Sequence, residues 1–475
     1  MKIDKKRLLK IALIILTSLL VLIIGWLHLN QLYNLTLKTA TIIGITINIL
    51  LILDTYVSNK DFKSVYLLFQ ILSLPFLYGQ LFTRYVLGIT MPNQYDLAPY
   101  VNINTEIIAI FLIAFCQLGM HLGYNMPAKT NKNKDTRNIG NPKASKRYLL
   151  ILGVVLITIS AIPAFINYSN NFKAAFLGGY SAKRALAVNG YSSISTKIVP
   201  FFFIGIISLI VGLEDNSKLQ KFIFIFALLF YASQILFGNR GLPIIYTIMI
   251  AWTYYYYLGK HKIKANNIIL VVIIIFVSSV ALNFIRENRG IGISEWGKKI
   301  NSSAVADNNP ILDICYEMGV TIYPIAYTME VVPNKIDYKK GKNYIYSVLS
   351  VITINLDGNN NEEFKKKMDI SNEISSYAGI PFGGSYIQEA YANFGRFSIM
   401  IMIIFGILLK KFDNLISKKT NMIYTVLLIY ISVSILWSIR NTTSSIPREV
   451  VWYSGSTYLL YIIIKNRVKL ERSKR

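Results

Sequence analysis

The chain has 475 residues, of which 53% are hydrophobic and only 16% are charged, and its mean hydropathy is +0.45. A soluble domain carries about 25% charged residues, so this composition excludes a soluble globular enzyme. The formal net charge of +26 does not indicate nucleic-acid binding, because no basic soluble domain is present to display that charge. We therefore expect an all-α polytopic membrane protein.

The N-terminal segment combines a charged start, Met1 to Arg7, with an apolar run over residues 8–27. This is the layout of a signal peptide, but no small-residue cleavage site follows the run. The residues found there instead are Trp26, His28 and Asn30. We therefore predict an uncleaved membrane anchor.

Apolar stretches of about 20 residues, enough to cross a membrane as a helix, recur along the chain. They lie at 8–27, 35–54, 65–89, 106–123, 148–168, 196–213, 219–237, 241–258, 267–284, 385–409, 421–439 and 450–464. We predict about twelve transmembrane helices. The predicted parts are an N-terminal bundle of about nine helices at 1–284, a large extracytoplasmic loop at 285–382, and about three helices with a cytoplasmic tail at 383–475.

Clusters of Lys and Arg follow alternate spans and predict the orientation of the chain. The densest cluster comes after the fourth span and consists of Lys129, Lys132, Lys134, Arg137, Lys143, Lys146 and Arg147. Since cytoplasmic loops are enriched in Lys and Arg, both termini should be cytoplasmic. Anionic lipid headgroups account for this inner charge.

A second set of cations is predicted to lie on the outer side, where topology selection disfavours positive charge. These residues are Arg84, Lys173, Lys183, Arg184, Lys197, Arg240, Arg286, Arg289, Arg440 and Arg448. An anionic ligand at the outer leaflet is the simplest explanation. Arg suits this purpose, because its planar guanidinium binds phosphate oxygens in a bidentate manner.

Two groups of outer arginines follow apolar spans in distinctive contexts. Arg240 lies between Gly238 and Gly241, which allow a tight hairpin and the close approach of a ligand; a snorkelling side chain is the alternative. Arg286 and Arg289 are three residues apart and share one helix face. They can converge on one anion, or one of them can pair locally with Glu287.

A third pair of arginines, Arg440 and Arg448, brackets the hydroxyl-rich segment 441–447. Hydroxyl groups and guanidinium groups both suit phosphate or sugar oxygens. An ordinary exposed turn is the alternative interpretation.

The tenth predicted span carries a polar stripe of Gln388, Glu389, Asn393 and Arg396. Ionisable groups at membrane depth are candidates for function. We interpret Glu389 as a general base or as a carboxylate that orients an acceptor hydroxyl. Structural pairing of Glu389 and Arg396 with other helices is the alternative.

Metal and disulfide chemistry are not expected. The chain has two Cys and three His, too few for a dedicated zinc site. Cys116 lies in an apolar span and Cys315 in an outer loop, so a disulfide between them is implausible. No Asp-x-Asp motif occurs in the predicted outer segments, so we predict that no metal and no other cofactor is needed.

Three features resemble Wzy-type polysaccharide polymerases of O-antigen and capsule assembly. They are the stretch from Gly383 to Gly395 with Glu389 inside it, the Gly238-Asn239-Arg240-Gly241 hairpin, and one large late outer loop. The spacing of Arg286 and Gly297 also fits a pattern associated with some members. Related O-antigen ligases have a functional His in their large outer loop. In this chain, none of His28, His121 or His261 lies in the predicted large loop, which favours a polymerase.

The resemblance implies a GT-C-like, multi-pass glycosyltransferase of the bacterial cytoplasmic membrane. It would polymerise undecaprenyl-pyrophosphate-linked oligosaccharides at the outer leaflet, and its partners would be donor and acceptor lipids, membrane lipids and a chain-length regulator protein. We assign catalysis to Glu389, Arg240 and Arg289. Pyrophosphate binding is assigned to Arg184, Arg240, Arg286, Arg289, Arg440 and Arg448, and sugar stacking to Tyr180, Tyr316, Tyr323 and Tyr386.

Two other functions use the same arginines. A flippase for lipid-linked oligosaccharides also needs to bind pyrophosphate, but transporters are often built from paired repeats, and none is seen between the two halves of this chain. An O-antigen-ligase-like glycosyltransferase would perform the same chemistry on a different acceptor.

Overall fold

A computed structural model of the protein describes most of the chain. The described residues are 36–59, 64–89, 97–126, 142–188, 193–236, 241–258, 310–352, 362–417 and 421–473. Their regular structure is entirely helical, which confirms the all-α prediction for this part of the chain. Helices lie over every predicted span except 8–27 and 267–284, which fall outside the described residues.

The first described helices are α2 (Leu37–Asn59), α3 (Val65–Leu81) and α4 (Ile103–Asn125). Helix α3 continues as the π-helix η1 (Phe82–Val86), and the short 3-10 helix η2 (Ala98–Tyr100) precedes α4. Side chains cap both later helices, because Ser64 accepts from the Leu67 N–H and Asn102 from the Asn104 N–H. Such caps satisfy backbone donors that a helix leaves open at its start.

The middle of the chain forms α5 (Pro142–Val188), α6 (Ser193–Gly212), α7 (Ser217–Leu236) and α8 (Gly241–Trp252), followed by η3 (Thr253–Tyr257). Helix α5 has 47 residues and is therefore about 70 Å long, more than twice the hydrocarbon thickness of a bilayer. The helix thus continues beyond the predicted span 148–168 as far as Val188.

The predicted large loop is also largely helical where it is described. It contains α11 (Pro310–Met318), η5 (Gly319–Thr321), α12 (Ile322–Val331), α13 (Lys342–Leu349), α14 (Glu362–Met368) and α15 (Ile370–Ala378). Helix α11 lies directly on α3, since a Cβ at Gly79 would stand 2.2 Å from the carbonyl oxygen of Cys315. This part of the segment therefore packs into the helical bundle, which the sequence did not predict.

The tenth predicted span, 385–409, is interrupted. It consists of α16 (Tyr386–Phe394), the 3-10 turn η6 (Gly395–Phe397) and α17 (Ser398–Ser417). Gly395 has φ +55°, a conformation that favours glycine, and a Cβ there would lie 2.8 Å from the Tyr338 ring. Glu389 consequently lies on a short helix of its own.

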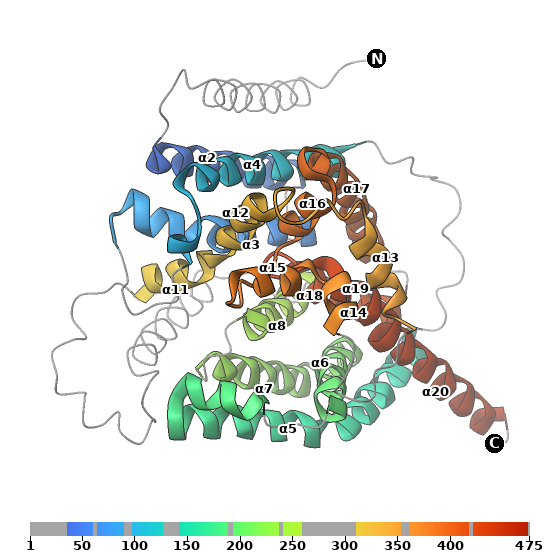
Figure 1. The fold of residues 1–475 in the computed structure, drawn as a ribbon. Coiled ribbons are helices and arrows are strands. Elements are labelled where there is room, and N and C mark those ends of the chain that lie inside the picture. Colours follow the sequence, from blue (N-terminus) through green and yellow to red (C-terminus); the bar gives the residue numbers. More distant parts are fainter. Residues whose placement is uncertain are drawn as a thin grey trace, which may run out of the picture.

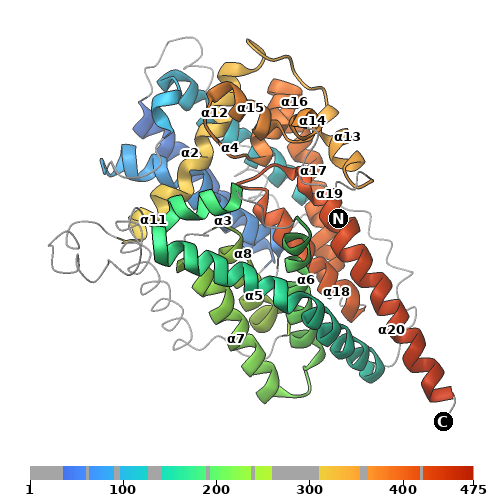
Figure 2. The same ribbon diagram turned by 60° about the horizontal axis from the view of Figure 1, so that its bottom comes forward.

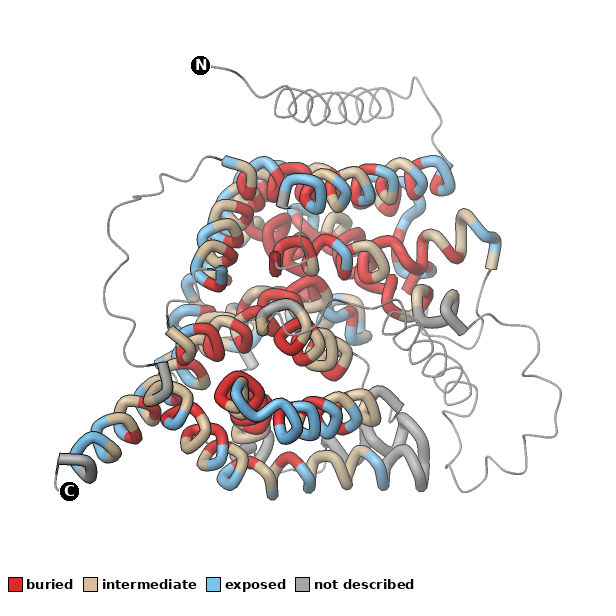
Figure 3. The backbone as a smooth tube through the Cα atoms, turned by 180° about the vertical axis from the view of Figure 1, so that it is seen from behind, coloured by how far each residue is buried: buried red, intermediate tan, exposed pale blue. Residues whose placement is uncertain are grey.

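The C-terminal part comprises α18 (Met422–Trp437), η7 (Thr443–Ser445), α19 (Ile446–Glu449), η8 (Val450–Gly455) and α20 (Ser456–Ser473). In Figure 1, α2 and α4 form one end of the molecule and α5, α6 and α7 the other, with α3, α12 and α16 between them. Figure 2 shows α20 projecting from the body. Buried residues concentrate in the middle of the molecule (Figure 3).

Five helical segments among the described residues are long and apolar enough to cross a membrane. They are Leu37–Ser58, Val65–Val86, Ile103–Asn125, Ala144–Lys173 and Tyr386–Ser417, and Pro200–Gly212 and Met422–Trp437 are shorter apolar helices. Large apolar side chains are exposed on several of them, including Leu53, Ile162 and Leu408. Apolar side chains on the outside of a helical bundle are expected where the solvent is lipid.

A buried polar network joins the helix ends that are predicted to face the cytoplasm. The Asp413 carboxylate accepts hydrogen bonds from Ser64 Oγ at 2.7 Å, the Val65 N–H at 2.8 Å and the Tyr124 hydroxyl at 2.9 Å. Beside it, His121 Nε2 lies 2.7 Å from Asp54 Oδ2. These contacts fix α2, α3, α4 and α17 relative to one another.

Small residues allow α4 and α17 to touch through their backbones. A Cβ at Gly123 would lie 2.0 Å from the carbonyl oxygen of Ile403, and one at Gly406 would lie 2.0 Å from that of Met120. Gly119 and Gly123 have the four-residue spacing that is common where membrane helices approach closely.

We expect Gly123→Ala to destabilise the protein by about 3 kcal/mol or more, at the upper end of ordinary overpacking, because backbone atoms cannot move aside. The yield of folded protein in mild detergent and its thermal unfolding midpoint would measure this. Gly455→Ala is the control, since its nearest neighbour would be the Val450 carbonyl oxygen at 3.9 Å. Equal midpoints for both variants would contradict the close α4–α17 contact.

Candidate functional site

The candidate site is built around Glu389, which lies in the first turn of α16. The Ser385 side chain caps this helix by accepting from the Ile387 N–H at 3.3 Å. Because backbone N–H groups point toward the start of a helix, negative charge is favoured there. The whole Glu389 side chain is buried.

The two carboxylate oxygens of Glu389 have different environments. Oε2 accepts from the Thr443 N–H at 2.7 Å and from the Thr443 hydroxyl at 2.6 Å. Oε1 is buried and has no hydrogen-bond partner among the described residues. Leaving a buried charged oxygen unsatisfied is costly, so Oε1 is the carboxylate oxygen of Glu389 with capacity for a further hydrogen bond.

Thr443 belongs to the turn between α18 and α19, which is attached to its surroundings at several points. The Tyr386 N–H donates to the Ser438 carbonyl oxygen at 3.0 Å, and Ser347 Oγ donates to the Ser444 carbonyl oxygen at 2.6 Å. Beyond the turn, the half-buried carboxylate of Glu449 accepts from the Tyr430 hydroxyl at 3.2 Å. Burial raises the pKa of Glu449. The turn is thus held against α16, α13 and α18.

The other end of α16 is held by residues that precede α13. Asn393 Oδ1 accepts from the Gly341 N–H at 2.9 Å, and the Lys340 N–H donates to the Asn393 carbonyl oxygen at 3.0 Å. In addition, Gln388 Nε2 donates to the Thr328 hydroxyl of α12 at 2.9 Å. The short helix that carries Glu389 is therefore fixed at both ends.

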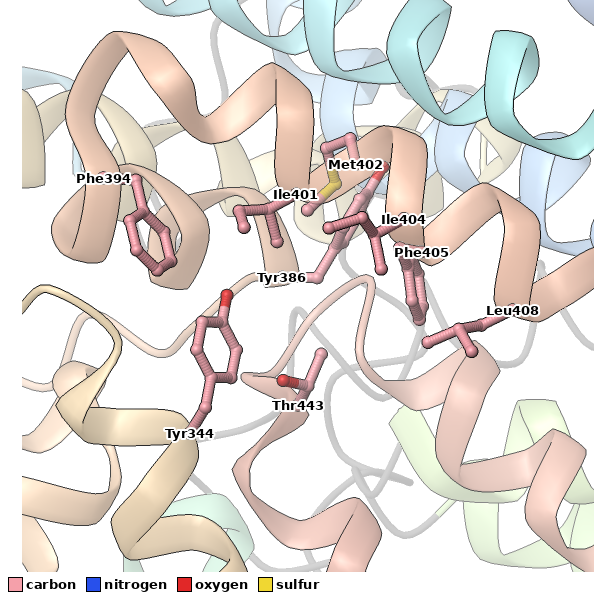
Figure 4. A pocket seen from close by; sticks show the side chains of 9 residues that line it. All are labelled: Tyr344, Tyr386, Phe394, Ile401, Met402, Ile404, Phe405, Leu408 and Thr443. Carbon is pink, nitrogen blue, oxygen red and sulfur yellow. The ribbon is translucent and has the colours of Figure 1, made fainter.

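A pocket of about 280 Å³ adjoins Thr443, the hydrogen-bond partner of the buried Glu389, which does not itself line the pocket. Tyr344, Tyr386, Phe394 and Thr443 line one part of it, as Figure 4 shows. The remaining lining comes from α17: Ile401, Met402, Ile404, Phe405 and Leu408.

Tyr344 is the second polar residue of interest at this pocket. Burial, together with the nearby Glu389 carboxylate, raises the pKa of its phenol well above the ordinary value. The phenol therefore stays protonated at neutral pH and can donate a hydrogen bond. Thr443 and Tyr344 thus place two hydroxyl groups at the pocket, next to the Glu389 carboxylate that Thr443 contacts.

Arg440 and Arg448 lie at the two ends of the Thr443 segment. The Arg440 guanidinium carbon stands 6.0 Å from the centre of the Phe76 ring. Arg448 donates from Nε at 3.2 Å and from Nη2 at 2.8 Å to the Ser350 carbonyl oxygen, at the end of α13. Arg448 thus holds the end of α13 in place. Binding of phosphate would be a second role of the same side chain.

A family model described as O-antigen polysaccharide polymerase Wzy matches residues 10–472, nearly the whole chain. The chain belongs to this family. No curated protein and no solved structure matches it. Family membership confirms the resemblance found in the sequence. It identifies the protein as a bacterial inner-membrane protein of the O-antigen polymerase family. It also favours a polymerase over a flippase or a ligase.

Several residues predicted for this Wzy-family site cannot be compared with the geometry. Arg240, Arg286 and Arg289 fall outside the described residues, and for Tyr180 and Arg184 only the backbone, on the extension of α5, is described. Tyr316 and Tyr323 are buried, so sugar stacking there stays a prediction that would require these rings to become accessible. Tyr386 lines the pocket.

Two residues of the site were not assigned a role from the sequence. Thr443 was part of the hydroxyl-rich segment, but its pairing with Glu389 joins positions 54 residues apart. Tyr344 lies in the predicted large loop without any motif around it. For Thr443, the only indication in the sequence was the hydroxyl-rich run Asn-Thr-Thr-Ser-Ser beside Arg440.

Proposed function

We propose that the protein extends O-antigen or capsular polysaccharide by glycosyl transfer between two undecaprenyl-pyrophosphate-linked oligosaccharides at the outer leaflet. A hydroxyl of the incoming unit attacks the anomeric carbon of the growing chain. A new glycosidic C–O bond forms while the bond from the anomeric carbon to the pyrophosphate breaks. Undecaprenyl pyrophosphate leaves with the bonding electrons, and the growing chain is now carried by the other lipid.

In this proposal Glu389 accepts the proton of the attacking hydroxyl. The observation that carries the assignment is the asymmetry of its carboxylate: Thr443 holds Oε2 in place, while Oε1 has no partner among the described residues. A general base must be both fixed and available for one new hydrogen bond. Tyr344 would donate to a neighbouring oxygen of the sugar.

The arginines are proposed to stabilise the leaving pyrophosphate, whose negative charge grows in the transition state. Cations placed in advance at that position lower the barrier selectively. Arg240, Arg286 and Arg289 are the first choices, with Arg440, Arg448 and Arg184 in support. Arg440 precedes Thr443 by three residues in the turn that contacts Glu389, which supports a location close to the reacting groups.

The direct test of this function is incubation of purified protein with a lipid-linked repeat unit, followed by electrophoresis of the products. We expect a ladder of polymers, both with and without a chelator. Among the described residues, no group of three or more His, Cys, Asp or Glu side chains could hold a metal ion, and the arginines would serve in place of a cation.

Two outcomes of this test would contradict parts of the proposal. Absence of any ladder, with lipid-linked substrate recovered unchanged, would argue against the polymerase function. A ladder that disappears with chelator and returns with added Mg²⁺ would retain the function but overturn the metal-independent mechanism.

A further inference from the structure

The pocket beside Thr443 continues along the membrane-facing side of α17. Two of its lining residues, Ile404 and Leu408, are each 53% exposed. They belong to a stripe of exposed apolar side chains, Phe397, Met400, Ile404, Leu408 and Leu415, at spacings of three, four, four and seven residues. Residues with this spacing share one helix face, and this face lies on a candidate membrane span. The pocket is therefore partly open toward lipid.

The polarity of the pocket changes from one part to the other. Thr443 and Tyr344 provide hydroxyl groups at the part that adjoins Glu389, whereas the lining from Ile401 to Leu408 is wholly apolar. The apolar lining runs from residue 401 to residue 408 of α17, seven helical steps or about 10 Å. A ligand that fits this surface has a polar group at one end and a hydrocarbon chain at the other.

The size of the pocket limits what it can hold. At about 280 Å³ it lies just below the usual range for small-molecule sites, about 300–1,000 Å³. An oligosaccharide repeat unit is too large, and its hydroxyl groups would be left without partners on the apolar lining. The first part of a lipid chain fits both the volume of the pocket and its apolar lining.

We infer that this groove along α17 binds the prenyl chain of a lipid-linked substrate and thereby places its pyrophosphate and first sugar at Thr443 and Glu389. This inference rests on the proposed function for the identity of the lipid. The remainder of the chain extends from Leu408 into the bilayer. The substrate can then enter sideways from the membrane, without leaving the outer leaflet.

Photochemical labelling tests the groove without any requirement for turnover. The probe is undecaprenyl pyrophosphate that carries a diazirine on its prenyl chain, added to the full-length protein in mild detergent, with labelled peptides identified by mass spectrometry. We expect labelling on α17 within 401–408. Unlabelled undecaprenyl pyrophosphate should compete at least tenfold better than dioleoyl phosphatidylglycerol.

Matched substitutions add a second measurement. Ile404→Trp and Leu408→Trp fill the groove and should lower the labelling of α17 at least fivefold. Ile159→Trp should leave it unchanged, since that side chain on α5 is exposed to a similar degree, 55%, but does not line the pocket.

The inference is overturned if labelling is spread evenly over exposed apolar helices, or if phosphatidylglycerol competes equally well, because the groove would then bind ordinary membrane lipid. These outcomes are independent of the polymerase test. A wild-type protein that forms ladders but labels evenly would contradict only the groove. One that labels within 401–408 but forms no ladder would contradict only the proposed reaction.

Discussion

Glu389→Gln is expected to lower the rate of chain extension by about 10²–10⁴-fold, the usual contribution of a general base, while the protein remains folded. Glutamine has nearly the same shape and can still accept a hydrogen bond from Thr443, but it cannot take a proton from the acceptor hydroxyl. The length distribution of polysaccharide from cells that express the variant at wild-type level would measure this effect. Glu363→Gln, at an exposed carboxylate paired with Lys367, is the control.

Variants at Thr443 separate the positioning of Glu389 from its chemistry. Thr443→Val removes the hydroxyl donor at 2.6 Å but keeps the backbone donor at 2.7 Å, so the rate should fall about tenfold or more. Thr443→Ser keeps the hydroxyl and should restore most of the activity. If Val and Ser variants polymerised equally well, the contact between Thr443 and Glu389 would have no role in the reaction.

Arg240→Ala and Arg289→Ala are each expected to lower the rate by about 10²–10³-fold, the effect of removing one preorganised donor from a site of developing charge. Lysine at these positions should recover only part of the activity, because an ammonium group cannot bind two phosphate oxygens as the guanidinium fork does. Polymer length in cells and the initial rate with purified protein are the two measurements.

The control for these arginines is Lys173→Ala, which removes a predicted outer cation that has no assigned role in the site. This variant should extend polysaccharide at the wild-type rate. That result would show that the loss of one positive charge is not by itself the cause of slow chain extension in the Arg240→Ala and Arg289→Ala variants. Wild-type ladders from both Arg240→Ala and Arg289→Ala, at normal protein levels, would remove the central role of these two residues.

Much of the fold could be predicted because lipid imposes simple rules on the sequence. Runs of about 20 apolar residues must form helices in a bilayer, and described helices coincide with the predicted spans from 35–54 onward, apart from 267–284. Breaks within such runs are harder to predict. Gly395 divides α16 from α17 through a positive φ, yet a glycine within an apolar helix is also common in uninterrupted membrane spans.

The candidate site was only partly predictable, for a related reason. Glu389 could be selected from its own position, because a carboxylate within an apolar span needs a reason to be there. Thr443 and Tyr344 could not, because hydroxyl residues in polar segments are ordinary and only tertiary packing brings α13 and the turn before α19 beside α16. The packing of α11 against α3 depends likewise on backbone contacts at Gly79 and Gly319, and no pattern in the sequence specifies which helix they meet.

The most direct measurement of the central claim compares purified wild-type and Glu389→Gln protein in a single assay that reports both substrate affinity and the rate of glycosidic bond formation. A carboxylate that acts only on the attacking hydroxyl predicts binding of lipid-linked substrate within about twofold of wild type and bond formation slowed at least about 100-fold. Bond formation at the wild-type rate would show that the carboxylate beside Thr443 takes no part in the chemistry.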